Sequence, residues 1–450
     1  MRFQRAQGLL ASTLMWTAAT VVGVGTLAGC SEPELATNLR PDGPPDVVTF
    51  MVQTDAFTEG GIPIEAASVC RAGDEKAPTM VTLPDQTVLQ VCPRVGTDDE
   101  AVSTVTNADP LAPQVRVVFD ELLDPSIEQL FNEDGDDCTA EDDGCTATIA
   151  ATNPVSVTCG GSPVAYDGYY VPNGNNVTWP PGPSLVVTFA AGDIATGAQC
   201  QLTINDNVVD KTGVVVPADQ RGPFMFEFAP MAFLGSDPEP DGLSVPVDSD
   251  SEFVLLFNAL IDEASVSGSD ITVVDSAGGT VATVLTVADT VIEVAADAGT
   301  WAPDAYTLSI PAGATFADVA GGTLTTTDVF ELNFCLGPAF IGSETADGEE
   351  LTPTSVVSLE FCADLDATAT PEANVVVRDA ANAVVAAQIA VEGSSLTITA
   401  PLPDAEWAPG DYTITIANGS VFEDAAPGTS TYTMPAAFTL TFTVPMPPMN

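Results

Sequence analysis

The chain has 450 residues, of which 45% are hydrophobic, and it carries 10 basic against 63 acidic residues, for a formal net charge of −53 at pH 7. So negative a chain repels nucleic acid and anionic lipid surfaces, which makes both poor partners and excludes nucleic-acid binding from our expectations. The sequence contains no histidine, which excludes histidine general bases, Ser-His-Asp triads and histidine-ligated zinc. We therefore expect a binding or structural protein and not an enzyme.

The first element in the chain has the layout of a bacterial export signal. A basic stretch at residues 1–5 precedes an apolar run over residues 8–25 that ends in small residues. The run closes on Leu27-Ala28-Gly29-Cys30, which resembles the lipobox of bacterial lipoproteins. The resemblance implies that residues 1–29 are a signal peptide and that Cys30 carries lipid at the start of the mature chain. The alternatives are an uncleaved anchor helix and an ordinary secretory signal.

The segment after the signal, residues 30–45, is polar and rich in proline, which predicts a tether. Ser31 stands where an aspartate retains many lipoproteins in the inner membrane. The lipoprotein resemblance therefore favours the outer membrane, with the folded part facing the periplasm or the cell surface. No later segment approaches eighteen uninterrupted apolar residues, so we expect no further membrane span.

The cysteine content favours disulfides. Eight cysteines remain beyond Cys30, an even number that fits an exported chain. A cysteine-rich metal site is the alternative, but no paired CxxC spacing supports it. Proximity along the chain favours the pairs Cys70–Cys92, Cys138–Cys145, Cys159–Cys200 and Cys335–Cys362.

One stretch, residues 132–145, concentrates acidic side chains. Carboxylates clustered on a turning backbone can supply the oxygen ligands that calcium needs. We reject an EF-hand, because Asp137 stands where that loop needs glycine and Asp143 where it needs glutamate. Two interpretations remain. The favoured one is a solvated acidic insertion; the other is a calcium loop with the candidate ligands Asp134, Asp136, Asp137, Glu141, Asp142 and Asp143.

The second half of the chain repeats itself with offsets of 104 to 107 residues. A period of this size indicates tandem globular domains and not a solenoid. The matching pairs are Phe233-Leu234-Gly235-Ser236 with Phe340-Ile341-Gly342-Ser343, Phe257–Asp262 with Phe361–Asp366, Trp301-Ala302-Pro303 with Trp407-Ala408-Pro409, and Phe316-Ala317-Asp318 with Phe422-Glu423-Asp424.

Apolar and hydroxyl side chains alternate within each repeat, as along residues 306–310, 412–416 and 438–444. This period of two predicts strands with one buried face, and about seven short strands per repeat predict an antiparallel β-sandwich. The first part of the chain follows the same plan, stretched by insertions at about 52–112 and 125–153. There Cys200 takes the place of Tyr412, so we expect its thiol to point inward, toward Cys159.

In order and spacing, these motifs resemble the bacterial Ig-like domains of the SbsA type. The resemblance implies a β-sandwich fold and an extracellular setting, and it implies no chemistry. The chain then divides into a signal peptide (1–29), a tether (30–45), an Ig-like domain with insertions and disulfides (46–230), and two further Ig-like domains (231–336 and 337–445). We call these domains the first, second and third units.

Two further sets of recurring residues have a structural and a functional interpretation. Asp124, Asp262 and Asp366 sit at equivalent places in different units, which favours turn capping over a shared carboxylate site. Trp301 and Trp407 each precede a proline and a tyrosine strand, which favours a structural corner over a sugar-stacking platform.

These features predict a lipid-anchored cell-envelope protein that acts in adhesion, spacing or assembly. The alternative is a calcium-dependent module that binds a glycan or an envelope protein through the inserted loops of the first unit, because loops carry binding whereas repeats that only space need none.

Overall fold

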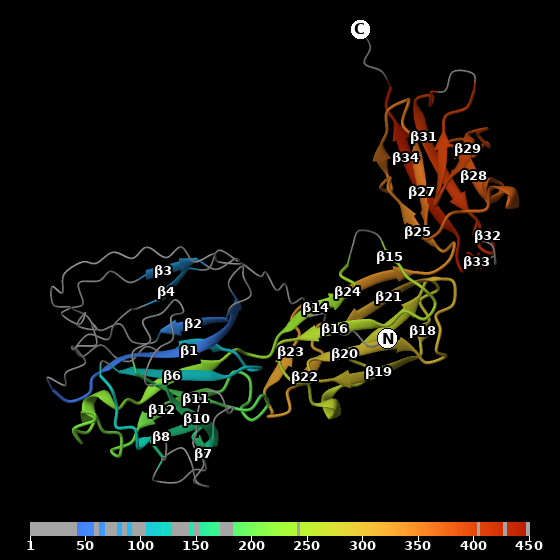
Figure 1. Cartoon of the computed structure of the whole chain (residues 1–450). Helices are drawn as coiled ribbons and strands as arrows, with labels where there is room; N and C mark the ends of the chain where they lie inside the picture. Colours follow the sequence, from blue (N-terminus) through green and yellow to red (C-terminus); the bar gives the residue numbers. More distant parts are fainter. Residues whose placement is uncertain are drawn as a thin grey trace, which may run out of the picture.

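The structure is a computed structural model that describes residues 43–57, 63–67, 79–82, 88–91, 105–119, 121–127, 145–147, 153–171, 183–240, 244–402, 406–425 and 430–446. The elements that lie wholly within these residues are β-strands and four short 3₁₀ turns, so the all-β prediction is confirmed. Three hydrophobic clusters form the cores of the three units, which follow one another along the chain in Figure 1. No helix in these residues has the length and apolar character needed to cross a membrane.

The second unit is a sandwich of two sheets, with the strand orders β14-β16-β20-β19 and β15-β24-β21-β17-β18. Alternation buries one face of each strand, and the rings of Phe253 (β16) and Phe334 (β24) meet between the sheets with centroids 4.2 Å apart. The elements are β14 (Phe233–Asp237), β15 (Val245–Pro246), β16 (Phe253–Phe257), η2 (Glu263–Ser265), β17 (Thr272–Asp275), β18 (Thr280–Val281), β19 (Thr283–Ala288), β20 (Val291–Ala296), β21 (Ala305–Ile310), β22 (Thr315–Ala317), β23 (Thr323–Thr325) and β24 (Phe330–Cys335).

The third unit repeats this plan, with sheets ordered β25-β27-β30-β29 and β26-β34-β31-β28. The alternating segments 412–416 and 438–444 lie in strands β31 and β34, which pair with each other over their whole length. The elements are β25 (Phe340–Ser343), β26 (Glu349–Glu350), β27 (Val357–Phe361), η3 (Ala367–Ala369), η4 (Pro371–Asn374), β28 (Val375–Asp379), β29 (Gln388–Glu392), β30 (Ser395–Thr399), β31 (Gly410–Ile416), β32 (Val421–Glu423), β33 (Thr431–Thr433) and β34 (Phe438–Val444).

The first unit wraps a longer sheet, β7-β10-β11-β6-β1-β5-β13-β12-β8-β9 with β2 beside β1, around one core. Phe50 of β1 stacks on Phe224 of β13 with ring centroids 5.1 Å apart. The elements are β1 (Val47–Phe57), β2 (Pro63–Ala67), the hairpin β3 (Thr79–Thr82) and β4 (Val88–Val91), β5 (Val105–Ala108), β6 (Gln114–Phe119), β7 (Cys145–Ala147), β8 (Val155–Cys159), β9 (Ser162–Pro163), β10 (Tyr166–Val171), β11 (Ser184–Thr188), β12 (Gln199–Ile204), η1 (Ala218–Gln220) and β13 (Phe224–Phe228).

The first insertion is shorter than the expected range 52–112. Strand β1 continues to Phe57, and β5 pairs in parallel with the last strand of the unit, as β15 does in the second unit. Both ends of the expected range therefore belong to the common framework. The sequence pattern missed β5 because its four residues alternate too briefly to show a period of two.

The recurring tryptophans and tyrosines form structural corners. Trp301 is buried and donates its indole N–H to the carbonyl of Ser251 at 2.8 Å, and the Tyr306 hydroxyl donates to the carbonyl of Ala302 at 2.8 Å. In the third unit, Trp407 and Tyr412 donate to Ser355 and Ala408 at 2.9 and 2.8 Å. Both indoles face the core, which leaves no exposed platform for a sugar ring.

The recurring aspartates cap turns, as the sequence predicts. The carboxylates of Asp124, Asp262 and Asp366 accept backbone N–H groups two residues ahead, at 2.8, 3.0 and 2.8 Å. The hydroxyls of Ser126 and Thr368, and then the accepted N–H groups, stabilise the charged carboxylates and hold the pKa values of Asp124 and Asp366 below the usual range. Each aspartate lies in its own unit and serves its own turn.

Candidate functional site

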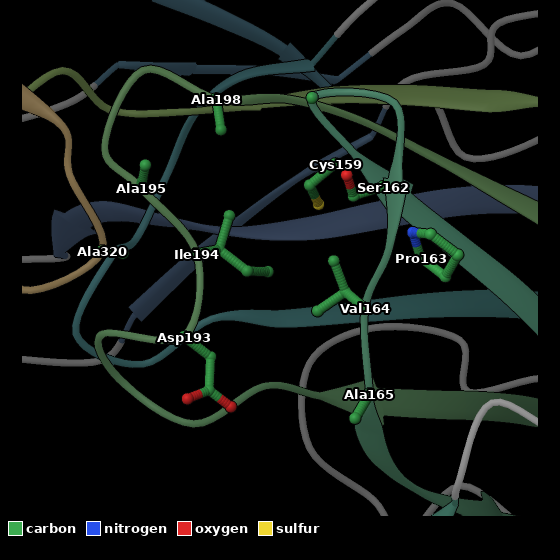
Figure 2. Close-up of a pocket in the computed structure, with 11 residues that line it drawn as sticks. Cys159, Ser162, Pro163, Val164, Ala165, Asp193, Ile194, Ala195, Ala198 and Ala320 are labelled. Carbon is green, nitrogen blue, oxygen red and sulfur yellow. The ribbon is translucent and has the colours of Figure 1, made fainter.

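A pocket of about 430 Å³ lies on the first unit beside the second. Figure 2 shows its walls: the turn between β8 and β9, the segment 193–198, and Ala320 of the second unit. Ile194 and Val164 face one another across it, whereas the Asp193 carboxylate points away from its centre. The lining residues are Cys159, Gly160, Ser162, Pro163, Val164, Ala165, Asp193, Ile194, Ala195, Ala198 and Ala320.

A disulfide fixes the wall of this pocket. Cys159 and Cys200 stand opposite one another on the antiparallel strands β8 and β12, and their sulfurs are bonded. Cys200 is buried and pairs in register with Phe226, as Tyr306 pairs with Phe334, so the expected inward orientation is confirmed. The lining mixes polar and apolar surface about equally, and it does not bring a nucleophile together with a base.

The junction between the first and second units contains a more specific arrangement of polar groups than the pocket does. Asp318, which is 4% exposed, accepts the backbone N–H of Thr196 from the first unit at 2.7 Å through Oδ2. Its Oδ1 accepts the N–H groups of Ala320 and Gly322 of its own turn at 2.8 Å each. A Cβ at Gly322 would lie 2.2 Å from Oγ1 of Thr196, so only glycine permits this approach. A buried carboxylate thus joins the two units.

The short linker between these units is held as well. Asn258 accepts the N–H of Ala232 at 2.7 Å and donates its amide to the carbonyl of Pro230 at 3.0 Å. Its own N–H donates to the carbonyl of Ala232 at 3.2 Å. A Cβ at Gly192 would lie 2.5 Å from Val319, so the surfaces beside the linker are in close contact. The linker is therefore clamped by three hydrogen bonds from one residue.

The junction between the second and third units replaces this clamp with a covalent bond. Cys362 occupies the repeat position of Asn258, and its N–H donates in the same way to the carbonyl of Ala339 at 2.9 Å. Its sulfur is bonded to Cys335, the last residue of β24. Cys335 is fully buried. The disulfide therefore runs from one unit to the next across the linker.

A second contact closes the same junction. The Tyr432 hydroxyl of the third unit donates to Oγ of Ser276 at 3.3 Å, and Ser276 in turn donates to the Asp304 carboxylate. Burial raises the pKa values of Asp304 and Tyr432, and their hydrogen bonds with Ser276 partly offset the rise. A Cβ at Gly337 of the linker would lie 3.0 Å from Oγ of Ser430, so the linker lies tightly against the third unit.

The expected site residues fall into two groups. Of the disulfide candidates, Cys159–Cys200 and Cys335–Cys362 are bonded, and Cys145 begins strand β7. The described residues contain no group of three acidic or cysteine side chains placed to hold a metal ion. The remaining candidates, the lipidation site and the calcium ligands among them, lie outside the described residues: Cys30, Cys70, Cys92, Cys138, Asp134, Asp136, Asp137, Glu141, Asp142 and Asp143.

No protein-family model matches the chain, and no curated protein matches it. Among solved structures it is similar to the N-terminal part of the bacterial S-layer protein SbsC, with 11% identity over 48% of this chain and 44% of that one and a TM-score of 0.17. It is also similar to the BSP domain of a biofilm-associated protein, with 11% identity, 75% and 64% coverage and a TM-score of 0.17. The chain spans less than two thirds of either protein.

Proposed function

We propose that the chain is a lipid-anchored cell-envelope protein whose Ig-like units form a stiff spacer, projecting the third unit away from the membrane. The observation that carries this proposal is the closure of both junctions between units. Tandem domains move relative to one another by default unless their interface is extensive. Here a buried carboxylate closes the first junction and a disulfide closes the second.

The strength of these closures supports a spacer. A hydrogen bond to a charged acceptor contributes about 1.5–3 kcal/mol, so the Asp318–Thr196 contact alone favours the closed junction by an order of magnitude or more. The disulfide holds the second junction without any such equilibrium. Both linkers are also too short and too well hydrogen bonded to act as random coils.

The disulfides also support the proposed location. Two bonded cysteine pairs fit an oxidising compartment outside the cytoplasm. The lipobox-like Leu27–Cys30 then supplies the anchor, since several acyl chains hold a protein stably where one holds it marginally. The full chain, expressed in a diderm bacterium with labelled fatty acid, should incorporate the label, and its Cys30→Ala variant should not. An unlabelled wild-type chain would contradict the lipid anchor.

Electron microscopy of the purified lipidated chain on vesicles tests the spacer. A label at the C-terminus should stand at one narrow distance from the bilayer. Truncation after residue 336, with Cys335→Ala and the label at the new C-terminus, should shorten that distance and keep it narrow, because the Asp318–Thr196 closure is retained. The triple variant Asp318→Asn, Cys335→Ala, Cys362→Ala should broaden the distribution, because both closures are lost. A wild-type distribution as broad as that of the triple variant would refute the spacer.

A further inference from the structure

We propose that this chain is built to carry tension, and that the Cys335–Cys362 disulfide transmits the force from the second unit to the third. The inference rests on the proposed anchored spacer and adds the direction of the force acting on it. A spacer that only sets a distance bears no pull, whereas one whose far end is held by another body is stretched between its anchor and that contact.

The strand arrangement of the second unit resists stretching. Its early strand β15 pairs in parallel with its last strand β24, with Val245 opposite Phe334 and Pro246 opposite Cys335, and the N–H of Val247 donates to the carbonyl of Cys335 at 3.0 Å. When the two ends of the unit are pulled apart, parallel neighbours slide along each other. Their hydrogen bonds are then strained together, and not one after another as in a hairpin pulled open at its ends.

The same parallel pair occurs in each unit. Strand β5 pairs in parallel with the last strand β13 in the first unit, and β26 does so with β34 in the third. The other strand pairs in the described residues are antiparallel, including those of the strands that come first in each unit, β1, β14 and β25. The parallel pair joins an early strand to the last strand of each unit, so all three units share a pair that is loaded in shear when the last strand is pulled away from it.

The disulfide changes the path of the force at the second junction. Cys335 ends β24, the strand that receives the force in the second unit, and Cys362 follows β27 of the third. Tension leaving β24 passes directly to Cys362 through the covalent S–S bond. The linker and the strands β25, β26 and β27 lie inside the 27-residue loop that the bond closes, so they cannot be pulled straight.

The two junctions provide an internal comparison. Asn258 and Cys362 hold their linkers through the same backbone contact, but only the latter adds a covalent bond. At the first junction the hydrogen bonds of Asn258 and the Asp318–Thr196 contact share the force with the linker. The covalent bond protects β25, which would otherwise be the first strand of the third unit to peel away from β27.

Single-molecule force spectroscopy on the mature chain, with Cys30→Ser and handles at both ends, tests the proposal. The matched variant is Cys335→Ala with Cys362→Asn, because asparagine installs the clamp that Asn258 already provides at the first junction. In the oxidised parent chain, the third unit should unfold at a higher force than in this variant. It should also release less length, by about 90–100 Å for 27 residues at about 3.3–3.6 Å each.

The control variant is Cys159→Ala with Cys200→Ala, which removes a disulfide within the first unit and should leave the third unit's event unchanged. An equal unfolding force of the third unit with and without the Cys335–Cys362 bond would overturn the proposal, since the bond would then serve resting stability alone. If the matched variant does not fold, the parent chain reduced before stretching replaces it, with the same two outcomes. If the chain is stiff on vesicles but the unfolding force is equal with and without the bond, the proposed spacer function is supported and only the proposed role in carrying tension is refuted.

Discussion

Replacing Asp318 with asparagine separates the closure of the first junction from the fold of its own turn. Asparagine is nearly the same size and keeps Oδ1, which accepts the N–H groups of Ala320 and Gly322. Its amide nitrogen takes the place of Oδ2, so a donor faces the N–H donor of Thr196 that now bonds at 2.7 Å. The substitution therefore removes one contact between units and leaves the turn in place.

The magnitude follows from that one contact. A hydrogen bond to a charged acceptor contributes about 1.5–3 kcal/mol, and every ~1.4 kcal/mol changes an equilibrium constant tenfold. Opening of the junction should therefore become about 10- to 150-fold more frequent. Hydrogen exchange at the Thr196 amide measures this directly, because that N–H is buried against Asp318 and exchanges when the junction opens.

The matched control is Asp210→Asn in the first unit. Asp210 occupies the equivalent turn, since Leu123 pairs with Asp210 as Ile261 pairs with Asp318, and it accepts the N–H groups of Thr212 and Val214 without contacting another unit. This variant should leave exchange at Thr196 unchanged. If Asp318→Asn also left it unchanged, the carboxylate would not hold the junction and our reasoning would be wrong.

Three further predictions concern stability and metal binding. Trp407→Ala should lower the free energy of unfolding of the third unit by about 3–5 kcal/mol, because the indole is fully buried, and calorimetry should show the other two units unchanged. The free energy of unfolding should fall as the pH rises above 10. Burial raises the pKa of Tyr306 to about 12 and also raises the pKa values of Tyr412 and Tyr432. These tyrosines therefore ionise at a lower pH in the unfolded chain than in the folded one, which favours unfolding. Denaturant titrations across that range check the sign, and Tyr306→Phe should make the fall less steep. If residues 132–145 form a calcium loop, calorimetry should detect binding that is lost when Asp134, Asp136 and Asp142 become Asn; absence of heat at millimolar calcium contradicts the loop.

The sequence predicts strands well here because alternation is directly visible where one face is buried. The alternating residues Tyr306, Leu308 and Ile310 predict β21, and their counterparts in segment 412–416 predict β31. The repeat extends this to weaker segments, since a position aligned with Tyr412 must face inward whatever residue fills it, and Cys200 does. The caps at Asp262 and Asp366 follow from the same local logic.

The contacts between units escape such patterns. Thr196 and Asp318 are 122 positions apart and belong to different repeats, so no period relates them. An aspartate does recur at this position, as Asp210 in the first unit and Asp424 in the third. Its role in the turn is enough to explain the recurrence, so the pattern gives no sign that the second carboxylate oxygen of Asp318 contacts another unit. The closeness of Cys335 and Cys362 along the chain predicts their pairing. The effect of this disulfide on the path of a pulling force could be inferred only from the strand order.

The chemistry of the junctions also determines how the chain responds to salt. With 63 acidic and 10 basic residues, neighbouring units repel one another, and this repulsion weakens as the Debye length falls from about 30 Å at 0.01 M to about 3 Å at 1 M. An extended shape that depended on repulsion would therefore collapse at high salt. The closures described above use backbone N–H groups, a hydroxyl pair and a disulfide, none of which is an ion pair. Small-angle scattering of the mature chain should give the same maximum dimension at both ionic strengths, and the variant lacking both closures should contract at 1 M. Contraction of the wild-type chain would mean that charge, and not contact, keeps the units in line.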